Sequence, residues 1–238
     1  MLNKQKGSNM YGFVDATWNT VKGKCPHDCS YCYMMRFGKQ AELHFDNSEL
    51  KTDLYKYGKN QFIFVGSSCD MWAFDCPSFY RSPLKGSWAY KTIMHCQKFP
   101  ENKYLLQSKN PQWILNWIGY LRKNFTIATT IETNRAYPQM GKAPPIGERI
   151  RALREIKDQG FETMITIEPI MDFDFAELTN WIYEARPDQV NIGADSQGHN
   201  LPEPTPGKIK ALIVMLSQFT RVTQKPNLKR LMHMGHGA

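Results

Sequence analysis

Short apolar runs alternate with longer amphipathic stretches along most of this 238-residue chain. An apolar run bounded by turn residues is typical of a buried strand, and an apolar stripe at helical spacing is typical of a helix that covers a sheet. We expect strands at residues 11–17, 62–65, 104–106, 125–131, 163–167 and 189–192, and helices from about residue 33 and at residues 48–57, 87–99, 112–122, 146–158, 175–185 and 208–219. Six repeats are fewer than the eight of a closed barrel, so the pattern predicts an α/β fold, a partial (βα)6 TIM-like barrel.

A group of three cysteines follows the first predicted strand. Cys25, Cys29 and Cys32 have CxxxCxxC spacing. Three thiolates on one short loop can hold three irons of a 4Fe-4S cluster and leave the fourth iron open to another ligand. A structural zinc site normally needs four N or S ligands, and the sequence has no second CxxC or HxxxH pair, while His27 would have to fold back between two cysteines. Because the chain has six cysteines in 238 residues and no apolar leader, we expect reduced thiols rather than a disulfide framework.

The cysteine run closely resembles the cluster-binding loop of the radical SAM superfamily. The resemblance implies that Cys25, Cys29 and Cys32 hold a 4Fe-4S cluster, and that the amino and carboxylate groups of S-adenosylmethionine (SAM) chelate its open iron. It also implies a barrel of the radical SAM type, because a partial (βα)6 barrel is the core of these proteins. The expected cofactors are the cluster and SAM, and the expected protein partner is a reductant such as flavodoxin or ferredoxin.

Polar residues and glycines break the apolar pattern where the predicted strands end. In a barrel of parallel strands these ends share one face, where the loops build the active site. We expect the SAM-binding residues to be Tyr31, Gly66, Ser67, Ser68, Lys109, Glu132, Asn134, Glu168, Gly193 and Asp195. Glu132 can accept hydrogen bonds from the ribose diol, and Lys109 can pair with the carboxylate of SAM. The backbone at Tyr31 can meet the adenine edge, and Gly66 and Gly193 let the cofactor approach the chain.

Four strand-end segments carry a narrower resemblance, namely residues 63–67 with Asp70 after them, 105–109, 166–169 and 191–196. Over residues 18–195 their order is similar to that of a bacteriophage-type radical SAM family of unknown function, itself similar to spore photoproduct lyase. That family usually has Gly-Gly-Glu-Ser where this chain has Gly193-Ala194-Asp195-Ser196, so the carboxylate of Asp195 is one carbon shorter. The resemblance implies one cluster and a SAM-derived radical, in the host cytoplasm if the chain is phage-encoded, and it does not supply the substrate.

Two further cysteines, Cys69 and Cys76, lie in the loop after the second predicted strand. A cysteine at this place can return a hydrogen atom to a substrate radical, as in chemistry like that of spore photoproduct lyase, so both are catalytic candidates. A buried structural thiol is the alternative, because unpaired cysteines are often part of the core. The aromatic residues Tyr33, Trp72 and Tyr137 fall near the expected mouth of the site, where they can stack on a base.

The overall composition indicates one domain with a preference for anionic partners. Hydrophobic residues make up 42% of the chain, so we expect a single domain over residues 1–238, with residues 221–238 as a loosely ordered C-terminal extension. No apolar run approaches the length of a membrane span, and we expect a cytoplasmic protein. A formal net charge of +8 permits a nucleic-acid partner.

The features together predict a radical SAM enzyme that abstracts hydrogen from a nucleic acid, a nucleotide or a modified base, with repair, isomerisation or tailoring of the base as outcomes. A first alternative keeps the radical chemistry and replaces the substrate by a small metabolite or peptide. A second alternative, from another class, is a nucleic-acid-binding module whose cysteine loop holds a structural metal.

Overall fold

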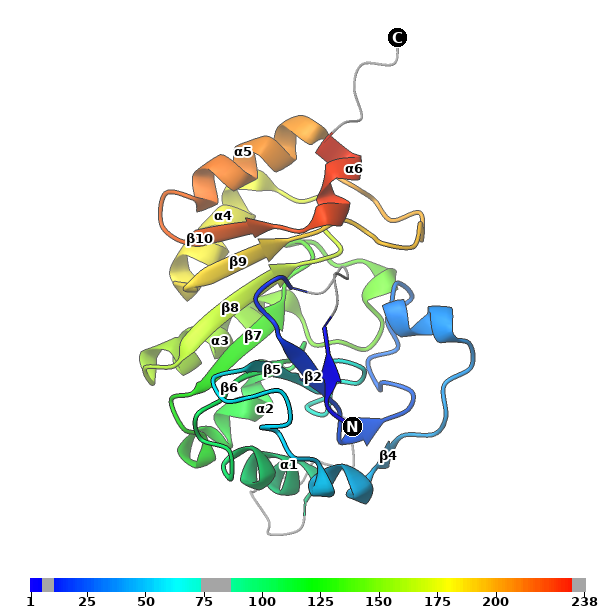
Figure 1. Cartoon of the computed structure of the whole chain (residues 1–238). Coiled ribbons are helices and arrows are strands. Elements are labelled where there is room, and N and C mark those ends of the chain that lie inside the picture. Colours follow the sequence, from blue (N-terminus) through cyan, green and yellow to red (C-terminus); the bar gives the residue numbers. More distant parts are fainter. Residues whose placement is uncertain (6–10, 74–86, 233–238) are drawn as a thin grey trace.

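A single large sheet organises the protein (Figure 1). The computed structural model describes residues 1–5, 11–73 and 87–232. The strands of the large sheet follow one another in chain order: β1 (Asn3–Lys4), β2 (Ala16–Trp18), β5 (Phe62–Val65), β6 (Lys103–Gln107), β7 (Phe125–Thr130), β8 (Glu162–Ile167), β9 (Gln189–Ile192) and β10 (Arg221–Gln224). β1 is antiparallel to β2, and all other neighbours are parallel. β3 (Val21–Lys22) and β4 (His44–Phe45) form a separate antiparallel pair. The predicted α/β partial barrel is confirmed.

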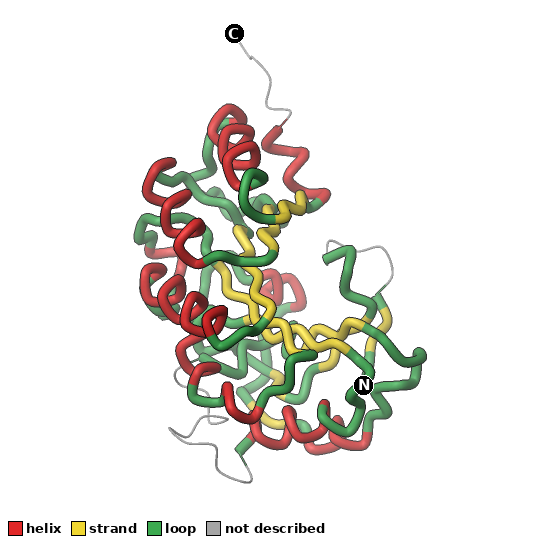
Figure 2. The backbone as a smooth tube through the Cα atoms, turned by 90° about the vertical axis from the view of Figure 1, so that its left-hand side faces the viewer, coloured by secondary structure: helices red, strands yellow, loops and turns green. Residues whose placement is uncertain are grey.

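Most of the helices lie along one side of the sheet (Figure 2). The helices are α1 (Trp88–Cys96), α2 (Pro111–Leu115), α3 (Ile146–Asp158), α4 (Phe175–Ala185), α5 (Pro206–Leu216) and α6 (Lys229–Met232). α3 shows why they pack there, because Ile146, Ile150, Leu153 and Ile156 recur on one face and are buried. The chain leaves α3 at Gly160, whose φ of +77° is a left-handed conformation that glycine adopts without strain.

Alternation along the strands gives the sheet two different faces. Ile63, Leu106, Ile127 and Ile165 belong to the large core that includes buried residues of the helices. The residues that alternate with them, Phe64, Leu105, Ala128 and Met164, form a second small core with Tyr11 and Val14. The segment after β1 therefore covers part of the face that the helices leave open, and the candidate site lies next to this cover.

Several predicted elements differ from the structure in length. The first strand is shorter than predicted, because residues 11–15 are not in a strand and only β2 pairs with β5. The helix predicted at residues 112–122 is divided at residues 116–117 into α2 and a 3-10 turn, η3 (Ile118–Tyr120), which contains Gly119, a poor helix former. The two early helices are 3-10 turns, η1 (Tyr33–Phe37) and η2 (Asn47–Lys51). By contrast, α3, α4 and β9 match their predicted bounds.

The C-terminal segment differs most from the expectation of a loosely ordered extension. Residues 221–224 form β10, which pairs in parallel with β9. A 3-10 turn, η5 (Pro226–Leu228), and α6 follow, with Leu228 and Leu231 both 1% exposed. Short strands with little apolar alternation, such as Arg-Val-Thr-Gln, carry too weak a pattern to be found from sequence. Residues 233–238 lie outside the described part of the chain.

Candidate functional site

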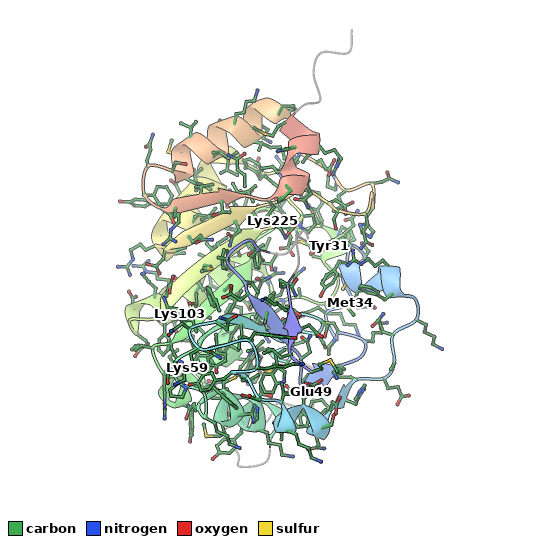
Figure 3. The ribbon with its side chains drawn as sticks, in the orientation of Figure 1. Tyr31, Met34, Glu49, Lys59, Lys103 and Lys225 are labelled. Atoms are coloured by element: carbon green, nitrogen blue, oxygen red, sulfur yellow. The ribbon has the colours of Figure 1, made fainter. Side chains whose placement is uncertain are left out.

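A cavity of about 820 Å³ lies at the carboxyl ends of the parallel strands. Its lining includes all three cysteines of the CxxxCxxC run, together with Tyr31, Gly66, Ser67, Ser68, Cys69, Lys109, Glu168 and Asp195. Figure 3 labels three lining residues, Tyr31 and Met34 from the cysteine loop and Lys225 from the C-terminal part of the chain. The strand ends thus bring together most of the site residues that were predicted from the sequence. Glu132, Asn134 and Gly193 are not part of the lining.

Backbone contacts hold the cysteine loop against the loop that follows β7. Lys142 N donates to His27 O at 2.7 Å, and Ser30 N donates to Gln139 O at 3.0 Å. Gly141, with a φ of +62°, makes this close approach possible, because a Cβ there would lie 2.2 Å from the carbonyl oxygen of His27. The loop is therefore positioned by main-chain contacts as well as by its own side chains.

The thiols of the loop have different surroundings. A hydrogen bond with Cys69 lowers the pKa of Cys25 to about 6, even though burial acts in the opposite direction. Burial raises the pKa of Cys29 and of Cys32. The Nζ atom of Lys109 lies 3.4 Å from the Cys29 sulfur, where its charge favours the thiolate. None of the five described cysteines is in a disulfide.

A network of buried charged residues contacts the cysteine loop through the hydroxyl of Tyr31. Glu132 is fully buried, and its Oε1 atom lies 2.7 Å from Lys109 Nζ and accepts a hydrogen bond from Tyr31 Oη. Its Oε2 atom lies 2.9 Å from Arg149 Nη1. Burial opposes ionisation of Glu132, but the charges of Lys109 and Arg149 outweigh it and lower its pKa to about 2. Tyr31 Oη also accepts from Lys109 Nζ at 2.7 Å.

These contacts revise the roles expected for Glu132 and Lys109. Glu132 is fully buried, lies outside the cavity lining and has protein partners on both carboxylate oxygens, so this residue does not offer them to a ribose diol. The ammonium of Lys109 already has three partners, on Glu132, Tyr31 and Cys29. Sequence reasoning missed Arg149, which is 1% exposed. The signal that could have found it is a charged residue inside the apolar stripe of α3, three residues after Ile146 and four before Leu153.

A second buried contact joins the cysteine loop to the β5 and β6 loops. His27 Nε2 lies 2.7 Å from Asp70 Oδ2, which also accepts from Ser108 Oγ and Lys109 N at 2.9 Å. Burial raises the pKa of Asp70, but the interaction with His27 and the hydrogen bonds from the backbone of Lys109 and Trp72 together outweigh burial, so the net pKa is lowered. His27 thus turns toward Asp70, and its place between two cysteines serves to tie three loops together.

Glu168 lines the cavity, and its carboxylate is held by the C-terminal segment. Its carboxylate pairs with Lys225 and accepts from Asn227 Nδ2 at 2.9 Å. A Cβ on Gly193 would lie 2.8 Å from this carboxylate, so Gly193 makes room for Glu168 rather than for a cofactor. Lys225 comes from the segment expected to be loosely ordered, and its Nζ atom also lies 4.8 Å from the ring centroid of Tyr11.

The two remaining predicted polar residues are placed differently. Asp195 lines the cavity, and its carboxylate accepts from the backbone of Gln197 at 3.1 Å and lies 2.7 Å from His199 Nδ1. Asn134 is turned away from the cavity toward α4, where its side chain bonds to Asp174 and Glu177. Asn134 therefore supports the surface near α4, and the expectation that it binds a cofactor finds no geometric support.

Of the residues predicted to be catalytic or to stack on a base, some line the cavity and others do not. Cys69 lines the cavity and is 3% exposed, while Cys76 lies outside the described residues. Trp72 is 1% exposed and packs edge-on against Trp117, so it is not available to a base. Tyr137 is half-buried, with its hydroxyl 3.4 Å from the carbonyl oxygen of Asp172. Tyr33 is 36% exposed and lies in the cavity lining.

The thiol arrangement suits a cluster better than a single ion. Within the described ranges, no three His, Cys, Asp or Glu side chains are placed to hold one metal ion. An iron–sulfur cluster takes one thiolate per iron, so its ligands need not converge on one point. Three cysteines on one loop, all facing one cavity, fit this requirement, and the donor set has the thiolate character that such clusters use.

Comparisons with known proteins agree on the fold. No family model matches the sequence, and no curated protein matches it either. A variant of spore photoproduct lyase with bound AdoMet and dinucleoside spore photoproduct has a TM-score of 0.65 at 10% identity, over 92% of this chain and 78% of that chain. SuiB of Streptococcus suis bound to S-adenosylmethionine has a TM-score of 0.59 at 10% identity, over 93% and 53% of the two chains.

A further structure, SuiB bound to its precursor peptide SuiA, has a TM-score of 0.62 at 9% identity, over 87% of this chain and 48% of that chain. At these identities the likeness concerns the fold, which is the partial barrel of radical SAM enzymes. The narrower likeness to a bacteriophage-type family stays a prediction. In the part of the chain that the structure describes, no helix is long and apolar enough to cross a membrane.

Proposed function

We propose that this protein is a radical SAM enzyme. The observation that carries the proposal is that Cys25, Cys29 and Cys32 face one cavity of about 820 Å³ at the carboxyl ends of parallel strands. A partial barrel uses this end for its active site. The fold likeness to spore photoproduct lyase and SuiB, which are radical SAM enzymes, supports the same conclusion.

The three cysteines would hold a 4Fe-4S cluster through their thiolates. When bound and reduced, such a cluster supplies the electron that splits SAM into methionine and a 5′-deoxyadenosyl radical, which takes a hydrogen atom from the substrate. The protein binds, orients and shields these groups. Tyr31 keeps the cysteine loop seated, because its hydroxyl is held by both Glu132 and Lys109.

The loops at the cavity supply the groups that SAM would need. Ser67 and Ser68 follow β5 and bring hydroxyls and backbone amides to the lining, next to Gly66 in its left-handed conformation. Glu168 and Asp195 bring carboxylates that suit an ammonium or a ribose hydroxyl. Lys109 would reach the carboxylate of SAM by exchanging one of its present partners.

The substrate class that we propose is a nucleic acid, a nucleotide or a modified base. The net charge of +8 favours an anionic partner. The likeness to a protein whose structure holds a dinucleoside supports the same class. Cys69 is buried in the cavity lining. Of the two cysteines predicted to return a hydrogen atom to the substrate, it is the one within the described residues. A small reductant such as flavodoxin or ferredoxin would supply the electron.

One anaerobic experiment tests the proposal. The protein is reconstituted with iron and sulfide, reduced with dithionite and mixed with SAM, and 5′-deoxyadenosine is measured by liquid chromatography. We expect the product with the unchanged protein and none with Cys29→Ala. Cys96→Ala is the matched control, because Cys96 is a buried cysteine of α1 outside the cavity lining, and it should still form product.

Two outcomes would contradict the proposal. Product formation that survives Cys29→Ala would show that the loop does not hold the reacting cluster. Purified protein that carries zinc and forms no 5′-deoxyadenosine would favour a nucleic-acid-binding module with a structural metal instead.

A further inference from the structure

The segment directly after Cys32 is exposed although it borders the cavity. None of the five residues of η1 is buried, and Met35 and Phe37 are 58% and 61% exposed. Residues 33–36 and 38–40 are part of the cavity lining. In Figure 1 this turn lies apart from the large sheet, to the right of β2. We refer to residues 33–40 as the rim segment.

Cations accompany the exposed apolar side chains of the rim segment. The guanidinium of Arg36 lies 4.6 Å from the ring centroid of Phe37 and 5.8 Å from that of Tyr33. Arg36 and Lys39 are both exposed, and among the described residues neither has a carboxylate within ion-pair distance. The nearby Lys24 is paired with Asp28 at 3.0 Å. The rim segment thus offers two cations that have no ion-pair partner in the described part of the chain.

The rim segment is also held in place. Tyr33 Oη donates to Ser67 O at 2.7 Å, and Gln197 Nε2 donates to Tyr33 O at 3.1 Å. Gln40 Nε2 bonds to the carbonyl oxygens of Met34 and Gly38 at 3.0 Å. The chain that carries Met35 and Phe37 is therefore anchored on both sides, and exposed apolar side chains that gather beside a cavity are typical of an interaction surface.

We propose that the rim segment binds a single-stranded or unpaired nucleic acid and delivers it to the cavity. A base would stack on the face of Phe37 or on Met35, and the flanking phosphates would pair with Arg36 and Lys39. A peptide partner is less well matched, since apolar anchors alone would not call for two uncompensated cations next to them. This inference rests on the proposed function for the role of the cavity, whereas the binding itself does not depend on the cluster.

The test measures the binding of a fluorescein-labelled single-stranded thymidine 12-mer to the reconstituted protein by fluorescence anisotropy. Phe37→Ala should weaken binding about tenfold, because one stacked base is lost. Arg36→Ala should weaken binding and lower the slope of log Kd against log salt by about 0.7, which corresponds to one phosphate contact on a single strand. An acidic peptide of similar charge serves as the competitor for the other class of partner.

Two control variants match these changes away from the rim segment. Tyr183→Ala removes an aromatic ring of α4 that is 62% exposed, and Lys210→Ala removes one positive charge from an exposed position of α5. Both should leave the Kd and the salt slope unchanged. No binding by the unchanged protein, equal effects of rim and control variants, or full displacement by the peptide would overturn the inference.

The two proposals fail separately. Formation of 5′-deoxyadenosine without oligonucleotide binding would remove the rim inference and leave the radical SAM proposal standing. Oligonucleotide binding that Phe37→Ala weakens, without any 5′-deoxyadenosine, would keep the rim inference and remove the enzymatic proposal.

Discussion

The inner and the outer side of the cysteine loop differ in the residues that they present: the inner side has buried charged and polar groups, and the outer side has exposed apolar ones. On the inner side, the Tyr31 hydroxyl bonds to Lys109 and to the fully buried Glu132, and both carboxylate oxygens of Glu132 have charged partners. On the outer side, two residues further along, the rim segment presents Met35 and Phe37 to solvent. The comparison teaches that charge pairing on the inner side fixes the cysteine loop. The rim segment on the outer side can therefore stay exposed.

The buried carboxylate is the strongest point of this contrast. Glu132→Gln would leave the cations of Arg149 and Lys109 uncompensated in the interior, and we expect a loss of about 3 to 5 kcal/mol in the free energy of unfolding. Urea unfolding followed by circular dichroism measures it. Asp158→Asn is the control, because it breaks an exposed ion pair with Arg186 and should cost less than about 1 kcal/mol. Equal losses would show that the inner side is not special.

The same carboxylate predicts a dependence on acid. The folded protein holds the pKa of Glu132 at about 2, below its ordinary value of 4.5. A lowered pKa stabilises the fold above the ordinary value, and this contribution is lost as the pH falls toward the folded value. Urea unfolding at pH 5, 4 and 3 should therefore show a steeper loss for the unchanged protein than for Glu132→Gln. Parallel pH profiles would contradict the assigned charge state.

Two tyrosines on either side of Cys32 allow a matched comparison. Tyr31→Phe removes a hydroxyl between two buried charged groups and should cost about 1 to 3 kcal/mol in unfolding free energy. Tyr33→Phe removes a hydroxyl that bonds to a carbonyl oxygen at the edge of the cavity, and should cost about 0.5 to 1 kcal/mol. A larger loss for Tyr33→Phe would reverse the contrast between the two sides.

The smallest effect is expected on the outer side. Phe37→Ala removes a ring that is 61% exposed, so we expect a change of less than about 0.5 kcal/mol in unfolding free energy. Thermal unfolding is sufficient to measure it, with the oligonucleotide affinity recorded on the same sample. A loss above about 1 kcal/mol would mean that Phe37 is a packing residue.

The strands of the fold could be predicted from the sequence better than the buried contacts that hold the site residues in place. The strands were predictable because buried parallel strands are short apolar runs with polar residues at their ends. The same rule placed Ser67, Lys109, Glu168 and Asp195 at one cavity. It failed for Glu132, because whether a strand-end carboxylate faces ligand or protein depends on partners far along the chain, here Arg149 on α3.

The late elements were missed for a related reason. β10 gains its stability from the ladder with β9 and from Leu228 and Leu231, which follow it, rather than from its own sequence. A four-residue strand without a clear apolar period carries no local signal. As a result, Lys225, which pairs with Glu168 in the cavity, was assigned to a loosely ordered tail.

The most direct test of the account is the electron paramagnetic resonance spectrum of the reconstituted, reduced protein with and without SAM. Three thiolates on a cluster leave one iron open, so we predict about four irons per chain and a cluster signal that changes when SAM is added. Cys29→Ala should lack this signal, while Cys96→Ala should keep it. A protein that binds zinc, or a cluster signal that SAM leaves unchanged, would contradict the central claim that the cysteine loop is the metal side of a SAM pocket.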